Sequence, residues 1–132
     1  MPFNSVIESK RRLIVTTGTG VLTGEEGLAC CRQLIERKDF DPTFNQLLDL
    51  THATRFDVTP SELQIIAAQP LFSGASRRAI VARNPTIFGL ARMFESYRSL
   101  SGVGEHVMVF SEIDSAVEWI ENPQSSENLF AS

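Results

Sequence analysis

The stretch LLDLTHATRFDVTPSEL, residues 47–63, decides how this chain folds. Its apolar start predicts a short buried strand over residues 47–50, and the letters TPSE at 59–62 predict the beginning of a helix. Thr59 is the expected N-cap of that helix, a proline takes the first helical position, and Glu62 completes a capping box. Open α/β sheets place their binding sites where a strand, a loop and a helix start follow one another.

Length and composition indicate one globular domain. The 132 residues can bury a core without disulfides, and the hydrophobic and charged shares, 42% and 21%, are close to globular averages. The apolar runs are far shorter than the about 20 residues that cross a bilayer, so no membrane span is expected. A net charge of −4 argues against nucleic-acid binding. The N-terminal residues lack the pattern of a secretory signal, so we expect a cytoplasmic protein.

Hydrophobic periodicity predicts strands and helices in alternation. The β-branched run 13–17 should pair with residues 3–9 in an antiparallel hairpin. The other expected elements are a helix from 23 to about 38, the strand at 47–50, a helix from 59 to about 70, a strand at 77–83, a helix after Asn84, a strand at 106–110 and a helix over 113–120 capped by Asp114 or Ser111.

This element order predicts an α/β fold. A mixed five-stranded sheet, with the first strand antiparallel and the rest parallel, should be covered by four helices. Residues 1–121 should form the domain and residues 122–132 a flexible C-terminal tail.

Several features that resemble chemical motifs have structural interpretations. Gly18 and Gly20 lack the ending of a P-loop and the third glycine of a dinucleotide site, so we interpret them as turn glycines. Cys30 and Cys31 have no His or Cys at metal-ligand spacing and are interpreted as structural thiols. No metal site is predicted.

Catalytic groups are equally sparse. Asp49 lacks the acidic pair and the lysine of a receiver-type phosphorylation site, so we expect it to accept backbone N–H groups. His52 and His106 are the two candidates for an acid or base, but no nucleophile elbow accompanies them. We therefore expect no enzymatic activity, and we assign no catalytic residue and no cofactor.

Three stretches carry a resemblance to a known family: LLDLTHATRFDVTPSEL at 47–63, RRAIVARNPTIFGLARMFESY at 77–97 and VMVFSEIDSAVEWI at 107–120. With the element order, they make residues 3–121 similar to the STAS superfamily. The match is better to its SpoIIAA-like branch, which is grouped with CRAL-TRIO lipid carriers. The resemblance implies a STAS/SpoIIAA-like fold and a non-enzymatic regulatory module that binds a protein partner.

The resemblance also implies a candidate interaction loop. In STAS anti-sigma-factor antagonists this loop ends in Asp-Ser-Ser-Gly-Leu, and its first serine accepts a phosphoryl group from a partner kinase. Here the matching letters begin at Asp57 and place Val58 at the acceptor position, so the usual phospho-switch is not expected. The loop candidates are Thr51, His52, Phe56, Asp57, Val58, Thr59 and Ser61.

An alternative function is a carrier or sensor of a small apolar or lipid-like anion held between the second and third helices. Arginines at the end of a strand and apolar side chains beyond the needs of one thin core motivate it. Its candidate residues are Arg83, Arg92, Phe72, Phe88 and Met93. Structural roles for the arginines and core packing for the apolar residues remain the competing interpretation.

The third helix also suggests self-association. Phe88 and Met93 lie outside its predicted sheet-facing stripe and widen the apolar arc beyond that of a one-sided helix. A second copy of the chain would cover them in a homodimer, or Leu129 and Phe130 of the tail would fold back over them.

Overall fold

Five strands form one sheet in the computed structural model, which describes residues 2–100 and 104–122. The strands follow each other across the sheet in the order β1-β2-β3-β4-β5. β1 pairs with β2 antiparallel and every other pair is parallel, which confirms the predicted mixed sheet. The elements are β1 (Phe3–Glu8), a 3-10 turn (Ser9–Arg11), β2 (Leu13–Thr23), α1 (Gly24–Glu36), β3 (Asn45–Asp57), α2 (Pro60–Ala67), β4 (Arg77–Val81), α3 (Pro85–Leu100), β5 (His106–Phe110) and α4 (Ile113–Glu121).

β2 and β3 are longer than the sequence predicts. β2 continues past residue 17 and β3 past residue 50 because the two strands pair with each other along this extension. The ladder is bulged at Gly18 and after Gly20, and Gly20 takes a φ of 69°, a left-handed conformation that favours glycine. The extra residues are on β3, so these glycines lie within β2 opposite bulges of β3 rather than in a turn. The loop predicted over residues 51–62 is wrong as far as residue 57, since residues 51–57 belong to β3.

The helices that follow β2 and β3 begin as predicted. Thr23 and Glu26 form a capping box at α1, in which the threonine oxygen accepts the Glu26 N–H and the Glu26 carboxylate accepts the Thr23 N–H. Thr59 and Glu62 form the same box at α2. Each box satisfies N–H groups that a helix start leaves unpaired.

The other two helices differ in their caps. Asn84 Oδ1 accepts the N–H groups of Thr86 and Ile87 at the start of α3, as the sequence predicts. At α4 the predicted caps, Asp114 and Ser111, are wrong: Glu112 is the N-cap residue, and its side chain makes no capping hydrogen bond. This helix is held mainly by its apolar face.

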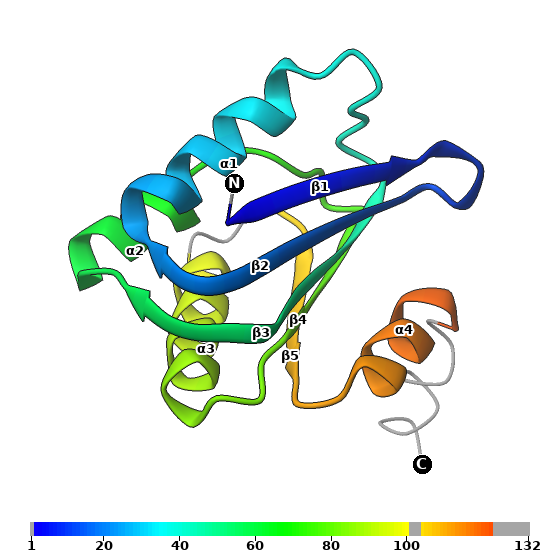
Figure 1. The fold of residues 1–132 in the computed structure, drawn as a ribbon. Helices are drawn as coiled ribbons and strands as arrows, with labels where there is room; N and C mark the ends of the chain where they lie inside the picture. Colours follow the sequence, from blue (N-terminus) through cyan, green and yellow to red (C-terminus); the bar gives the residue numbers. More distant parts are fainter. Residues whose placement is uncertain (1, 101–103, 123–132) are drawn as a thin grey trace.

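Helices cover both faces of the sheet. Figure 1 places α4 on one side and α2 and α3 on the other. The α4 side buries a small core that the helix shares with alternate residues of β2, β3 and β4. Its buried members are Leu13, Leu47, Ala79, Val81, Ala116, Trp119 and Ile120.

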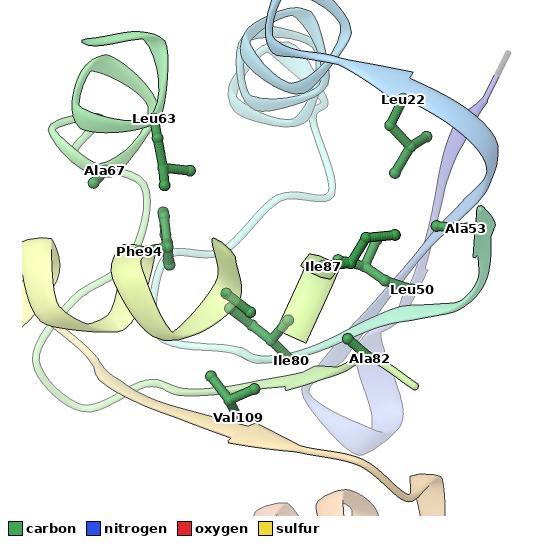
Figure 2. Close-up of a cluster of buried hydrophobic side chains, with 11 residues drawn as sticks. Leu22, Leu50, Ala53, Leu63, Ala67, Ile80, Ala82, Ile87, Phe94 and Val109 are labelled. Carbon is green, nitrogen blue, oxygen red and sulfur yellow. The ribbon is translucent and has the colours of Figure 1, made fainter. Parts of the chain in front are cut away.

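The larger core lies on the other side, beneath α1, α2 and α3. Figure 2 shows Leu63 of α2 and Phe94 of α3 pointing toward each other above Ile80 of the sheet. A second group of buried residues, centred on Ile14 and Leu34, lies between β2 and α1. Phe88 packs partly against the larger core, whereas Met93 is 37% exposed. The third helix therefore covers more of its apolar arc within one chain than its sequence predicts.

Two further sequence predictions concern the C-terminal tail and the absence of a membrane span. The predicted tail, including Leu129 and Phe130, lies outside the described residues except for Asn122, the residue that follows α4. Within the part of the chain that the structure describes, no helix has the length and apolar character needed to cross a membrane.

Candidate ligand-binding site

A cavity of about 80 Å³ lies between the sheet and the three helices α1, α2 and α3. Most of its wall is aliphatic and aromatic. The sheet contributes Phe3, Thr16, Gln46, Leu48, Leu50, Phe56, Arg78 and Ile80. The helices contribute Gly27, Cys30, Cys31, Leu34, Leu63, Ile66, Ile87, Leu90, Ala91 and Phe94.

One side of the cavity is polar. Thr16, Gln46 and Arg78 come from the neighbouring strands β2, β3 and β4, and all three are buried. Gln46 Nε2 donates to Thr16 Oγ1 at 2.9 Å, and Arg78 Nε donates to Gln46 Oε1 at 2.9 Å. The Thr16 hydroxyl also shares a hydrogen bond with Ser5 of the edge strand β1. Register places these side chains together, because Gln46 pairs with Arg78 and Thr16 with Ser5 across the sheet.

Arg78 continues this network into a buried ion cluster. Its Nη1 donates to Glu105 Oε1 at 3.0 Å, and Arg98 Nη2 donates to Glu105 Oε2 at 2.8 Å. Arg98 Nη1 also donates to the Ala67 carbonyl at the end of α2. The cluster therefore ties the beginning of β5 to the ends of α2 and α3.

Two aromatic rings hold Arg78 in place. The guanidinium carbon lies 4.8 Å from the centre of the Phe72 ring and 5.2 Å from that of Phe94. Such cation–π contacts are strongest where water is excluded, and Arg78 is only 6% exposed. The side chain is thus fixed in direction at the wall of the cavity.

The Glu105 carboxylate is ionised. Burial raises its pKa, but the attraction of Arg78 and hydrogen bonds that include those from Arg78 and Arg98 outweigh burial, so its pKa lies below the ordinary value. Gly104, the residue before it, has a φ of 127° and leaves space that a Cβ would take from Arg98. The turn before β5 is therefore shaped around the ion cluster.

The two cysteines are free thiols. Burial, with the neighbouring Cys31 as a smaller cause, raises the pKa of Cys30 to about 11, and burial also raises the pKa of Cys31. Both thiols line the cavity. A surface groove of about 200 Å³ shares Phe3, Cys30 and Leu34 with the cavity, so Cys30 lies between the groove and the interior.

The predicted interaction residues occupy the extension of β3 and the start of α2. Phe56 is the one of them that lines the cavity, and Val58 packs against the same core. Asp57 forms an exposed pair with Arg55, and Thr59 is occupied as the N-cap. Thr51 donates its N–H and hydroxyl to Asp49. His52 and Ser61 are exposed.

The predicted ligand residues do not gather at one place. Arg83 and Arg92 are exposed and lie 3.6 Å from Glu112 and 3.4 Å from Glu95. Phe72 is buried and packs on Arg78 from outside the cavity lining, and neither Phe88 nor Met93 lines the cavity. The cavity beneath α1, α2 and α3 is therefore lined by other residues.

The remaining polar candidates do not come together either. Asp49 Oδ1 accepts the N–H of Thr51, which confirms its predicted structural role. His52 lies in the distal part of β3, while His106 begins β5 beside Arg77 at the other end of the sheet. No three His, Cys, Asp or Glu side chains among the described residues are grouped closely enough to hold a metal ion.

Sequence reasoning missed Thr16, Gln46 and Glu105 and treated Arg78 as one of several arginines near a strand end. One feature of the sequence could have indicated the buried ion cluster. In the run Arg77 to Arg83, Arg78 shares its face with Ile80 and Ala82, so a strand buried on both faces carries a charged residue inside. Such a residue requires a buried partner.

Comparison with known proteins bears on the fold. No protein-family profile and no curated protein sequence matches the chain. Among solved structures, the fold is similar to an uncharacterised protein from the DUF3478 family with a SpoIIAA-like fold from Shewanella loihica PV-4. The TM-score is 0.55 at 15% identity, covering 89% of this chain and 91% of that one. At this identity the likeness shows the fold alone. The chain has a STAS/SpoIIAA-like fold, as its sequence resemblance implies.

Proposed function

We propose that this protein binds a small, mostly apolar molecule in the cavity beneath α1, α2 and α3. The observation that carries the proposal is the composition of the wall, which is aliphatic and aromatic except for one polar side at Thr16, Gln46 and Arg78. Ligand sites are typically concave and apolar with a few fixed polar groups that orient the ligand. The function is that of a carrier or sensor.

The size of the cavity limits the ligand. A cavity of about 150 Å³ holds benzene, so about 80 Å³ accommodates roughly three carbon-sized groups as the structure stands. A six-carbon chain with a polar end therefore requires side chains of the cavity wall to shift. A larger lipid would require α2 or α1 to move away from the sheet.

We also propose that ligand binding in the cavity regulates contact with a protein partner, which connects this proposal with the SpoIIAA-like fold. Phe56 lines the cavity, and it belongs to the exposed segment, residues 51–61, that the sequence indicates as an interaction surface. Occupancy of the cavity would therefore bias the position of Phe56 and the start of α2, the surface that a protein partner would contact.

Native mass spectrometry of the freshly purified full chain tests the proposal. We expect a retained small mass, or uptake of hexanol when the protein is purified empty. Cys30→Leu places a larger side chain in the cavity and should abolish both. The matched control, Arg32→Leu, introduces the same side chain at an exposed position of the same helix and should bind as the wild type does. A wild-type protein that neither retains a ligand nor binds hexanol would contradict the proposal.

The regulatory output is proposed to work without phosphorylation. Val58 occupies the acceptor position, and the Thr59 oxygen already accepts the Glu62 N–H at 3.1 Å. Incubation with a kinase of the anti-sigma type should leave residues 51–62 unmodified. Phosphopeptide mapping that found stoichiometric phosphate on Thr59 or Ser61 would show that the switch uses a neighbouring hydroxyl.

A homodimer through α3 is a separate proposal. Because Phe88 packs partly against its own core, Met93 is the side chain that a second copy would cover. Met93→Asp should shift a dimer toward monomer without disturbing the core, and light scattering at several protein concentrations measures the effect. A wild-type chain that stays monomeric at high concentration would end this idea.

A further inference from the structure

The polar side of the cavity carries a positive charge, on Arg78, that nearby acceptors and negative charge do not fully neutralise. Two nitrogens of the Arg78 guanidinium are occupied, since Nε donates to Gln46 and Nη1 donates to Glu105. Nη2 donates to no acceptor among the described residues. The Arg78 side chain is only 8% exposed, so little water reaches this charged donor and an added acceptor would lower the free energy.

The charge partner of Arg78 is shared. Glu105 places one carboxylate oxygen on Arg78 and the other on Arg98, and its side chain is only 1% exposed. Its single negative charge is therefore divided between two buried guanidinium groups. Burying a cation is favourable only when it is paired and hydrogen-bonded, so Arg78 has unused capacity for a second anionic group.

The neighbouring polar groups suit the same kind of ligand. Gln46 Nε2 gives one of its two hydrogens to Thr16, which leaves a second amide hydrogen on a side chain that lines the cavity. Gln46 Oε1 already accepts from Arg78, so this group presents a donor rather than an acceptor. Donors on neighbouring strands, one of them charged, select against a cationic ligand end.

We infer that the cavity takes a short-chain aliphatic monocarboxylate whose carboxylate accepts hydrogen bonds from Arg78 Nη2 and the Gln46 amide. The alkyl chain lies against the apolar wall formed by residues such as Leu48, Leu50 and Ile80. The inference rests on the proposed function, because it assigns a chemical class to the ligand of the same cavity.

Three ligands of equal length test the assignment on the full-length protein: hexanoate, hexanol and hexylammonium, each titrated by calorimetry at neutral pH. We expect hexanoate to bind at least about tenfold more tightly than hexanol, because a hydrogen bond to a charged group exceeds one to a neutral group by that order. Hexylammonium should bind more weakly than both. Hexanol binding as tightly as hexanoate would overturn the inference and leave the proposed function intact, whereas no binding by any of the three would overturn both.

Arg78→Met tests the residue. It removes the guanidinium while leaving Glu105 paired with Arg98, and it should abolish the preference for hexanoate over hexanol. An unchanged preference would overturn the role of Arg78. If this variant does not fold, Gln46→Leu removes the second donor and should lower the preference in the same direction, and the wild-type ligand series remains decisive for the chemical class.

Discussion

The two faces of the sheet are built from alternate residues of the same strands, and they differ in what they enclose. On β4, Ala79 and Val81 face α4, whereas Arg78 and Ile80 face the cavity beneath α1, α2 and α3. The α4 face is filled by aliphatic side chains and Trp119. The cavity face holds a space of about 80 Å³ and a buried ion cluster, which joins the start of β5 to the ends of α2 and α3.

Under the proposed function, this difference distinguishes residues that only pack the core from residues that would also contact a ligand. Arginine occurs on both faces, but Arg77 lies over the exposed side of the α4 core, 5.2 Å from the Trp119 ring centre, and is partly solvated. Arg78, its neighbour, is buried with Glu105 and Arg98. A buried ion cluster is seldom the most stable filling of a core, so its presence beside a cavity favours a binding role.

The largest expected effect comes from removing the charge that holds the cavity face together. Glu105→Gln leaves Arg78 and Arg98 without their carboxylate and should lower the free energy of unfolding by about 3–5 kcal/mol. Glu121→Gln is the control on the other face, since its pair with Arg11 is half exposed and should matter little. Denaturant unfolding measures both, and equal effects would contradict the comparison.

The same variant has an expected pH dependence. The pKa of Glu105 is lowered in the folded state, so its contribution is present above the unfolded-state pKa, about 4.3, and is lost as pH falls through the folded value. The gap in stability between wild type and Glu105→Gln should therefore be constant near neutral pH and narrow below pH of about 4. A gap that widens on acidification would contradict this assignment.

A pair of buried alanines tests the difference in packing. Ala116 of α4 is fully buried in the filled core, and Ala91 of α3 lines the cavity. Ala116→Leu should cost about 1–3 kcal/mol because a filled core has no room for the added atoms. Ala91→Leu should cost clearly less, because its side chain enters existing space. Thermal unfolding of both variants decides, and a larger loss for Ala91→Leu would show that the cavity does not exist in solution.

Helix capping also differs between the two faces of the sheet, and its expected effect on stability is smaller. The helices above the cavity begin with side-chain caps, while Glu112 at α4 makes none. Thr59→Ala should lower stability by about 1 kcal/mol, and Glu112→Ala should leave it nearly unchanged. Urea denaturation of the two variants measures the difference, and an unaffected Thr59→Ala protein would leave this threonine free for another role.

The smallest effect is kinetic and concerns the Cys30 thiol beside the surface groove. With a pKa of about 11, roughly one Cys30 in a thousand is a thiolate at pH 8, so alkylation by iodoacetamide should be slow and accelerate about tenfold per pH unit. A ligand in the cavity should slow it further. Mass spectrometry on a Cys31→Ser background follows Cys30 alone, and fast reaction at pH 8 would contradict its burial.

The fold follows from sequence wherever local signals and tertiary contacts agree. The capping boxes at Thr23 and Thr59 and the apolar runs of β4 and β5 specify helices and strands that pack as predicted. The local sequence signals do not predict the strand that is present between residues 17 and 23 and between residues 51 and 57. There, glycines and polar residues disfavour strand locally, but the pairing of β2 with β3 satisfies the backbone and extends both strands.

The site was less accessible to sequence reasoning for a physical reason. Thr16, Gln46, Arg78 and Glu105 come from four different strands or turns, and only the sheet register brings them together. No regular spacing of these four residues in the sequence indicates that they lie together in the fold. The placement of Arg78 within an apolar strand was the one local indication. Phe56 was predicted for a partner surface, and the structure places it in the cavity lining.

The most direct test of the account is a methyl NMR titration of the wild-type protein with hexanoate. The reporters are side chains on opposite faces of the same strands, with Leu50, Ile80 and Ile87 at the cavity and Leu47, Val81 and Ile120 beneath α4. We expect saturable shifts of the first three signals and no change in the other three. Equal shifts on both faces, or no saturable shift at the cavity, would contradict the claim that one face binds a ligand and the other only packs.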